Sequence, residues 1–182
     1  DGWVHLDAAF GMWAAASDTA RQHVEGLASA DSWATDAHKW LNVPYDCGLV
    51  FCADPEAHRA ALRTTADYLT VAPDGARDPA DYTPDLSLRA RGLVLWSTLR
   101  HLGTRGVAEL IDRCCSLARR LADQLVLVDG ISIVNDVALN QVLVVFDTDD
   151  PDDPSIRLDH IVEALQRGGT GWASPTVWRG TP

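Results

Sequence analysis

The sequence predicts an α/β protein, with a parallel α/β layer in its first part and a small α+β unit in its second. Apolar segments of strand length alternate with helical segments up to about residue 100. Two further strand candidates, at residues 131–134 and 142–146, lie between helical segments. Hydrophobic residues make up 47% of the 182 positions and charged residues 23%, which is enough apolar material for a packed core.

Three strands and two helices are expected in the first part. The strands are expected at residues 3–7, 31–36 and 47–52. The third of these is an unbroken apolar run, which is typical of a strand buried on both faces. Ser17 and Asp18 form a good N-cap pair for the first helix. The second helix is expected to begin with Asp54 as N-cap and Pro55 at its first position.

A long irregular stretch, residues 64–88, separates this part from the helices that follow. Such a stretch is uncommon in a compact domain and is often a functional loop. Helical spacing returns at residues 89–101 and 107–125, where apolar side chains recur at i, i+3, i+4 and i+7. We therefore expect two domains, at residues 1–100 and 101–182.

After the strands of the second part, a last helix is expected around residues 158–165, and a short strand at 174–178. The acidic segment 147–154 contains a proline and no glycine, which favours a solvated loop over a calcium site. No metal is expected.

Composition excludes several classes of function. The formal net charge is −11, whereas a nucleic-acid binder needs a cationic face. No apolar run approaches the roughly 20 residues that cross a bilayer, so no membrane span is expected. We expect a cytoplasmic location. The four cysteines lack the C-x-x-C spacing of zinc or redox sites and are expected to be reduced.

One lysine, Lys39, stands among 15 basic residues, so the other 14 are arginines. Lysine can lose its proton and form a Schiff base, and arginine cannot. The alternative is a solvated loop cation. This alternative is weakened by three apolar neighbours that indicate partial burial, Trp33, Trp40 and Leu41.

Polar residues follow two of the predicted strands. Asp7 ends the first strand, and Asp36, His38 and Lys39 follow the second. In open α/β sheets, ligands bind beyond the carboxyl ends of the strands, so these residues stand where a site is expected. Taken alone, Asp7 has the alternative role of an ordinary turn residue.

Four segments resemble the pyridoxal-phosphate-dependent group II amino-acid decarboxylases, which include the aromatic-amino-acid, tyrosine and glutamate decarboxylases. The segments are HLDAAFG, DSWATDAHKWLNVPYDCG, LRARGLVLWSTLRHLG and SPTVWRG. The resemblance implies a fold-type I, aspartate-aminotransferase-like protein. It also implies a partial chain: the C-terminal part of the large domain that binds pyridoxal 5'-phosphate, and most of the small domain.

The resemblance also implies roles for five residues. Lys39 matches the lysine that forms a Schiff base with pyridoxal 5'-phosphate. Asp7 matches the carboxylate that pairs with the pyridine nitrogen, and Ala9 matches the small residue packed against the ring. His38 matches a histidine near the phosphate. Asp36 is expected to contact the cofactor, at a position that is often Asn in the animal enzymes.

Tyr68 matches a mobile-loop tyrosine that delivers a proton after carbon dioxide leaves, and this favours simple decarboxylation. Its alternative is an exposed loop residue. The resemblance thus implies a homodimeric enzyme of amino-acid metabolism, with its active site at the interface, that decarboxylates an L-amino acid to the amine. One alternative is an aldehyde synthase or lyase of the same fold, and another is a catalytically silent fragment or interaction domain. Arg89 and Arg91 are expected to be structural salt-bridge partners, with minor contacts to the site as the alternative.

Overall fold

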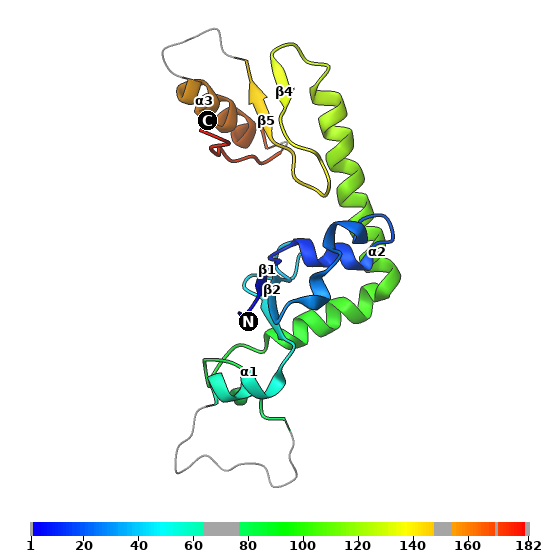
Figure 1. Ribbon diagram of the computed structural model, residues 1–182. Helices are drawn as coiled ribbons and strands as arrows, with labels where there is room; N and C mark the ends of the chain where they lie inside the picture. The colour runs from blue at the N-terminus through cyan, green and yellow to red at the C-terminus, as the bar shows by residue number, and fades with distance from the viewer. Residues whose placement is uncertain (1, 64–76, 148–153, 170, 181–182) are drawn as a thin grey trace. The chain divides into compact units, whose positions relative to one another are not determined.

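A computed structural model describes residues 2–63, 77–147, 154–169 and 171–180, and in 154–157 the backbone alone (Figure 1). The chain forms two compact units, Asp1–Arg113 and Cys114–Pro182. We describe each unit by itself. The division into domains after residue 100 stays a prediction.

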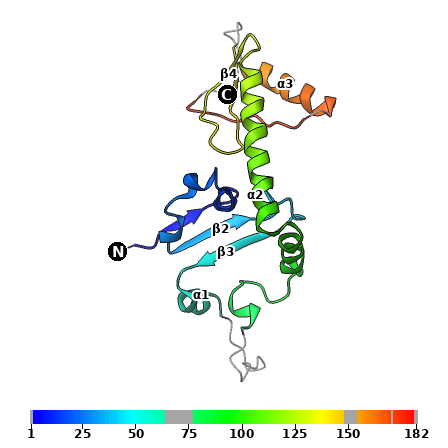
Figure 2. The same ribbon diagram turned by 90° about the vertical axis from the view of Figure 1, so that its right-hand side faces the viewer.

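The first unit is built on a three-stranded sheet in the order β1-β2-β3. Its strands are β1 (His5–Asp7), β2 (Ser32–Asp36) and β3 (Gly48–Cys52). β1 runs parallel to β2, as expected, but β3 runs antiparallel to β2 (Figure 2). The wholly parallel layer predicted from the sequence is therefore wrong. A parallel pair needs a crossover connection, usually helical, and residues 37–47 between these two strands form turns.

β3 is also more exposed than its apolar sequence predicts. Val50 is half exposed, while Phe51 packs its ring 4.2 Å from that of Trp33 on β2. None of the five residues of β3 is buried, so the prediction of a strand buried on both faces is wrong.

The helix expected after Ser17 is replaced by short 3₁₀ turns. After η1 (Gly11–Ala16), which ends just before Ser17, these turns are η2 (Arg21–Val24) and η3 (Leu27–Ser29). Gly26 lies between the last two at φ +85°, a left-handed conformation that ends the helical path. The buried Ser17 still acts as a cap, since its Oγ accepts from the backbone N–H of Ala20 at 3.0 Å. The same Oγ donates to Asp112 Oδ1 at 2.5 Å.

The next helix, α1 (Pro55–Leu62), begins as predicted. Asp54 Oδ1 accepts from the backbone N–H of Glu56 and of Ala57, at 3.0 and 2.9 Å. A single 3₁₀ turn, η4 (Pro79–Asp81), is joined to α1 by an Arg59–Asp81 ion pair of 2.7 Å.

The two helices predicted at residues 89–101 and 107–125 together form α2 (Arg91–Leu125). The helix is broken at Gly103, whose φ of 63° and ψ of 179° are not helical. Val107 and Ile111 are buried in the first unit, as their spacing predicts.

In the second unit, β4 (Ile131–Ile133) and β5 (Val144–Phe146) form an antiparallel pair, followed by α3 (Pro154–Gly168). The strand expected at residues 174–178 is not formed, and only an isolated bridge at Trp178 is present there. All four cysteines are free, as expected. Among the described residues, no helix is both long and apolar enough for a membrane span.

Candidate active site

Three of the predicted site residues lie on one face of the sheet. Asp7 pairs with Ala34 across the parallel strands β1 and β2, and paired residues point to the same side. Asp36 is two residues beyond Ala34, so it shares that face. Ala9 lies beside Asp36, because the backbone N–H of Asp36 donates to the Ala9 carbonyl at 2.6 Å. The chain thus brings two carboxylates to one end of one sheet face.

Small residues surround these carboxylates. Ala34 lies between them on β2, Ala9 continues the chain beyond β1, and Gly48 pairs with Asp36 from β3. A Cβ placed on Gly48 would lie 3.4 Å from Asp36 Oδ1, so the glycine leaves that flank uncovered. Short side chains beside the acidic groups therefore leave room for a ligand there.

Lys39 projects from the turn that follows β2. Its neighbours Ala37, Trp40, Leu41 and Val43 are each at most 6% exposed and anchor the turn. The Lys39 side chain itself keeps 47% of its surface exposed. The sequence prediction of partial burial holds for the neighbours, while the amine stays accessible.

We call Asp36, His38 and Lys39 the sheet-end cluster. Lys39 Nζ lies 3.1 Å from Asp36 Oδ2, and His38 Nε2 lies 3.7 Å from the same oxygen. The imidazole is nearly buried, with 9% of its side chain exposed. One carboxylate oxygen therefore faces two groups that can each gain or lose a proton.

The backbone fixes the tautomer of His38. The N–H of Cys47 donates to His38 Nδ1 at 3.0 Å, so Nδ1 must be the unprotonated nitrogen. In the neutral ring the proton then sits on Nε2, the nitrogen that faces Asp36. The ring of Tyr45 packs against the His38 imidazole, with 4.1 Å between the two ring centroids.

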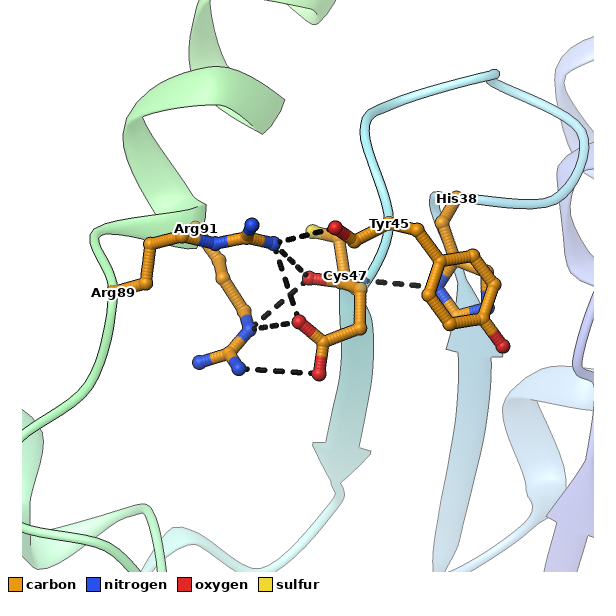
Figure 3. Close-up of polar contacts among 6 residues, drawn as sticks. His38, Tyr45, Cys47, Arg89 and Arg91 are labelled. Atoms are coloured by element: carbon orange, nitrogen blue, oxygen red, sulfur yellow. Dashed lines mark hydrogen bonds and ion pairs between the residues drawn. The ribbon is translucent and has the colours of Figure 1, made fainter.

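A second charged group, which we call the turn clamp, consists of Asp46, Arg89 and Arg91. Arg91 Nε and Nη2 donate to Asp46 Oδ1 and Oδ2 at 3.0 and 3.1 Å. Arg89 Nη2 donates to the Asp46 carbonyl at 3.0 Å and to the Tyr45 carbonyl at 2.9 Å. Figure 3 shows both arginines on one side of this turn and the rings of Tyr45 and His38 on the other. The prediction that these arginines are salt-bridge partners is confirmed.

The clamp changes the ionisation of its members. The hydrogen bond from Arg91 holds the pKa of Asp46 below its ordinary value of 3.8, and the Asp46 backbone adds to this. In return, the bond to Asp46 raises the pKa of Arg91. Burial raises the pKa of the neighbouring Cys47 thiol above its ordinary 9.0, which keeps the thiol protonated and unreactive.

The structure brings Asp36, His38 and Lys39 together and places Asp7 and Ala9 on the same sheet face as Asp36. Tyr68 lies outside the described residues. The contact from Cys47 to His38 was not predicted, because a backbone N–H leaves no mark in a sequence.

The side chains at this end of the sheet suit a planar group that carries an electrophilic carbon and a protonated ring nitrogen. Asp7 Oδ1 accepts from the Ala9 N–H at 3.1 Å, and its other oxygen accepts no hydrogen bond within the described part of the chain. That oxygen is free to pair with a protonated ring nitrogen. Together with the Lys39 amine and the short side chains of Ala9 and Ala34, this carboxylate fits pyridoxal 5'-phosphate.

Comparison with known proteins gives matches over most of the chain. Residues 1–148 match the family model described as "Pyridoxal-dependent decarboxylase conserved domain". Tyrosine/DOPA decarboxylase 2 of Papaver somniferum is 33% identical over 131 residues, covering 70% of this chain and 24% of that protein. Phenylacetaldehyde synthase of Arabidopsis thaliana is 33% identical over 127 residues, covering 68% of this chain and 26% of that protein. The chain therefore spans about a quarter of these relatives.

Solved structures share the fold. A crystal structure of Oryza sativa TDC with PLP and tryptamine gives a TM-score of 0.88 at 25% identity, covering 98% of this chain and 38% of that one. Mouse CSAD in apo form gives a TM-score of 0.75 at 24% identity, covering 91% of this chain and 36% of that one. These matches confirm the fold class that the sequence resemblance implies.

Proposed function

Because the chain belongs to the pyridoxal-dependent decarboxylase family, we propose that it takes part in decarboxylating an L-amino acid to the corresponding amine. Pyridoxal 5'-phosphate is the cofactor in this proposal, and Lys39 carries it as a Schiff base. The relatives named as decarboxylases and the donor set around Lys39 support the proposal.

The observation that carries it is the position of the Lys39 amine. The chain has one lysine, and its Nζ is accessible yet lies 3.1 Å from Asp36 Oδ2. An amine must lose a proton before it can act as a nucleophile. Asp36 can orient the Lys39 ammonium toward the ligand, and His38 Nε2 faces the same carboxylate oxygen. When bound, the cofactor supplies the electron sink for the bond that breaks.

Asp7 has a separate task in the proposal. Its carboxylate would hold a proton on the ring nitrogen by charge, which strengthens the withdrawal of electrons from the reacting carbon. The Ala9 N–H fixes one of its oxygens and leaves the other for this contact. Ala9 would pack against the ring because a methyl group leaves the face clear.

The remaining roles complete the proposal. His38 would lie near the phosphate and orient Asp36. Tyr68 would return a proton to the substrate carbon after carbon dioxide leaves. We also propose a homodimer with its active site at the interface, a cytoplasmic location, and a domain boundary after residue 100, with 1–100 in the cofactor-binding domain.

The product of the reaction tests this proposal. The full-length protein is supplied with pyridoxal 5'-phosphate and a panel of L-amino acids, and carbon dioxide, amine and aldehyde are measured. The amine is expected, and Lys39→Ala should give no product. If neither product forms with any amino acid, the chain is a silent member of the family and the proposal is wrong.

An aldehyde synthase is the second candidate. It is supported by the 33% identity to phenylacetaldehyde synthase, which matches the identity to tyrosine/DOPA decarboxylase 2. This activity would consume oxygen and water and release the aldehyde with carbon dioxide, ammonia and hydrogen peroxide. The same assay separates the two candidates when oxygen uptake is followed alongside the products.

A further inference from the structure

We propose that the turn clamp is a positioning device for His38, and that it acts through the backbone N–H of Cys47. Asp46, Arg89 and Arg91 are positioning residues in this account and touch neither substrate nor cofactor. The use of a positioned His38 rests on the proposed function, whereas the positioning itself is a property of the folded chain.

The first step runs from the arginines to the turn. Arg91 holds both carboxylate oxygens of Asp46, and its Nε also donates to the Asp46 carbonyl at 3.0 Å. Arg89 binds the carbonyls of Tyr45 and Asp46. The two guanidinium groups thus hold the backbone carbonyls of Tyr45 and Asp46 and the side chain of Asp46. Both arginines lie more than 40 positions further along the chain.

The second step runs through Cys47, the residue after Asp46. Its carbonyl accepts from the Ala37 N–H at 2.8 Å, and its own N–H donates to His38 Nδ1 at 3.0 Å. Consecutive residues on the Lys39 turn are therefore tied to one residue of the clamped turn. Cys47 is 3% exposed, so this contact is closed to water.

The third step concerns the protons of the sheet-end cluster. Because Nδ1 accepts from Cys47, the neutral ring carries its proton on Nε2, which points toward Asp36 Oδ2 at 3.7 Å. Without the Cys47 bond, both tautomers become available, and the ring can turn its unprotonated nitrogen toward the carboxylate. Asp36 would then lose a partner that steadies it beside Lys39.

Arginine suits this task for a chemical reason. A guanidinium keeps its charge at every pH at which the protein is folded, and it binds a carboxylate with two parallel N–H groups. The two arginines of the clamp therefore take no part in proton transfer. A lysine in place of Arg91 would keep a charge but lose the paired bonds.

Nuclear magnetic resonance of the full-length protein, labelled with ¹⁵N-histidine and free of cofactor, tests the inference. His38 is assigned by the signal lost in His38→Gln. The variants are Asp46→Ala, which removes the clamp carboxylate, and Arg91→Lys, which is milder and serves if the first fails to fold. Asp18→Ala is the matched control, since it removes an exposed Arg–Asp pair, with Arg21, in the same unit.

Wild type and Asp18→Ala should show an unprotonated Nδ1 and a protonated Nε2 in His38. Asp46→Ala should show averaged signals from both tautomers, with a smaller shift in Arg91→Lys. Alkylation of Cys47, relative to Cys52 in the same molecule, should become about fivefold faster in Asp46→Ala.

An unchanged tautomer in Asp46→Ala overturns the inference, whether or not Cys47 alkylation accelerates, because the clamp is then only a fold contact. Cofactor binding is not part of this readout. A Lys39 that fails to bind pyridoxal 5'-phosphate would overturn the proposed function and leave the tautomer result standing.

Discussion

The sheet-end cluster and the turn clamp are both built from one carboxylate and two basic residues, and their carboxylates, Asp36 and Asp46, lie near the two ends of the connection between β2 and β3. In the sheet-end cluster the basic residues are His38 and Lys39, which can release a proton. In the turn clamp they are Arg89 and Arg91, which cannot. The distances are similar, at 3.0–3.7 Å. The difference in chemistry therefore lies in the residue type: one group can transfer protons, and the other can only hold its shape.

The largest effect is expected when the lysine of the sheet-end cluster is replaced by an arginine, the basic residue of the turn clamp. Lys39→Arg keeps the charge and can still pair with Asp36, but a guanidinium cannot become a free amine. We expect complete loss of turnover with little change in the free energy of unfolding. Turnover and urea unfolding are measured on the same sample, and turnover near the wild-type level would contradict the role of Lys39.

Asp7→Asn should give the next largest effect. The amide keeps the size of the side chain and can accept from the Ala9 N–H, but it removes the negative charge. We expect turnover to fall roughly 10²–10³-fold, as when one electrostatic contact to a reacting group is lost. Alkylation of Cys47 should not change, since Asp7 is not a member of the turn clamp. A fall of less than about threefold would remove Asp7 from the site.

Ser17→Ala tests the scaffold of the first unit, to which both clusters belong. The Ser17 hydroxyl is fully buried and bonds to Asp112 while capping the following turn. Loss of a hydrogen bond to a charged group costs about 1.5–3 kcal/mol of unfolding free energy. Ser29→Ala, at an exposed serine, should cost less than about 0.5 kcal/mol. Equal destabilisation in urea titrations of the two variants would show that the buried contact adds nothing.

The smallest effect is the acid titration of Asp46. Because its pKa is lowered in the folded state, the clamp adds stability above pH 3.8 and loses it as the pH falls through the folded pKa. Between pH 4 and 7 the ion pairs of Asp46 with Arg89 and Arg91 should therefore persist. The carboxyl carbon shift of Asp46 measures this directly, with a midpoint expected below 3.8. In Arg91→Lys the midpoint should rise, and a wild-type midpoint at or above 3.8 would contradict the account.

Much of the sheet-end cluster was predictable because its members are close in sequence. Asp36, His38 and Lys39 follow one strand end, and the apolar neighbours of Lys39 already indicated an anchored turn. The clamp depends on contacts between residues 43–45 positions apart, whose pairing no local pattern specifies. The two arginines could be predicted as ion-pair partners, but not the acid that they bind.

The errors in the fold have a similar origin. The apolar run at Gly48–Cys52 predicts a strand but carries no information on its direction, which the helix-free connection decides. The residues after Ser17 have helical spacing, yet Gly26 and the bond from Ser17 to Asp112 favour separate 3₁₀ turns. In both places a tertiary constraint overrides the local pattern.

The most direct measurement traps the cofactor on the chain. The full-length protein is incubated with pyridoxal 5'-phosphate, reduced with borohydride and digested, and the labelled peptide is identified by mass spectrometry. The account predicts one phosphopyridoxyl group on the peptide containing Lys39, and none there in Lys39→Arg. A wild-type protein labelled elsewhere, or not at all, would contradict it.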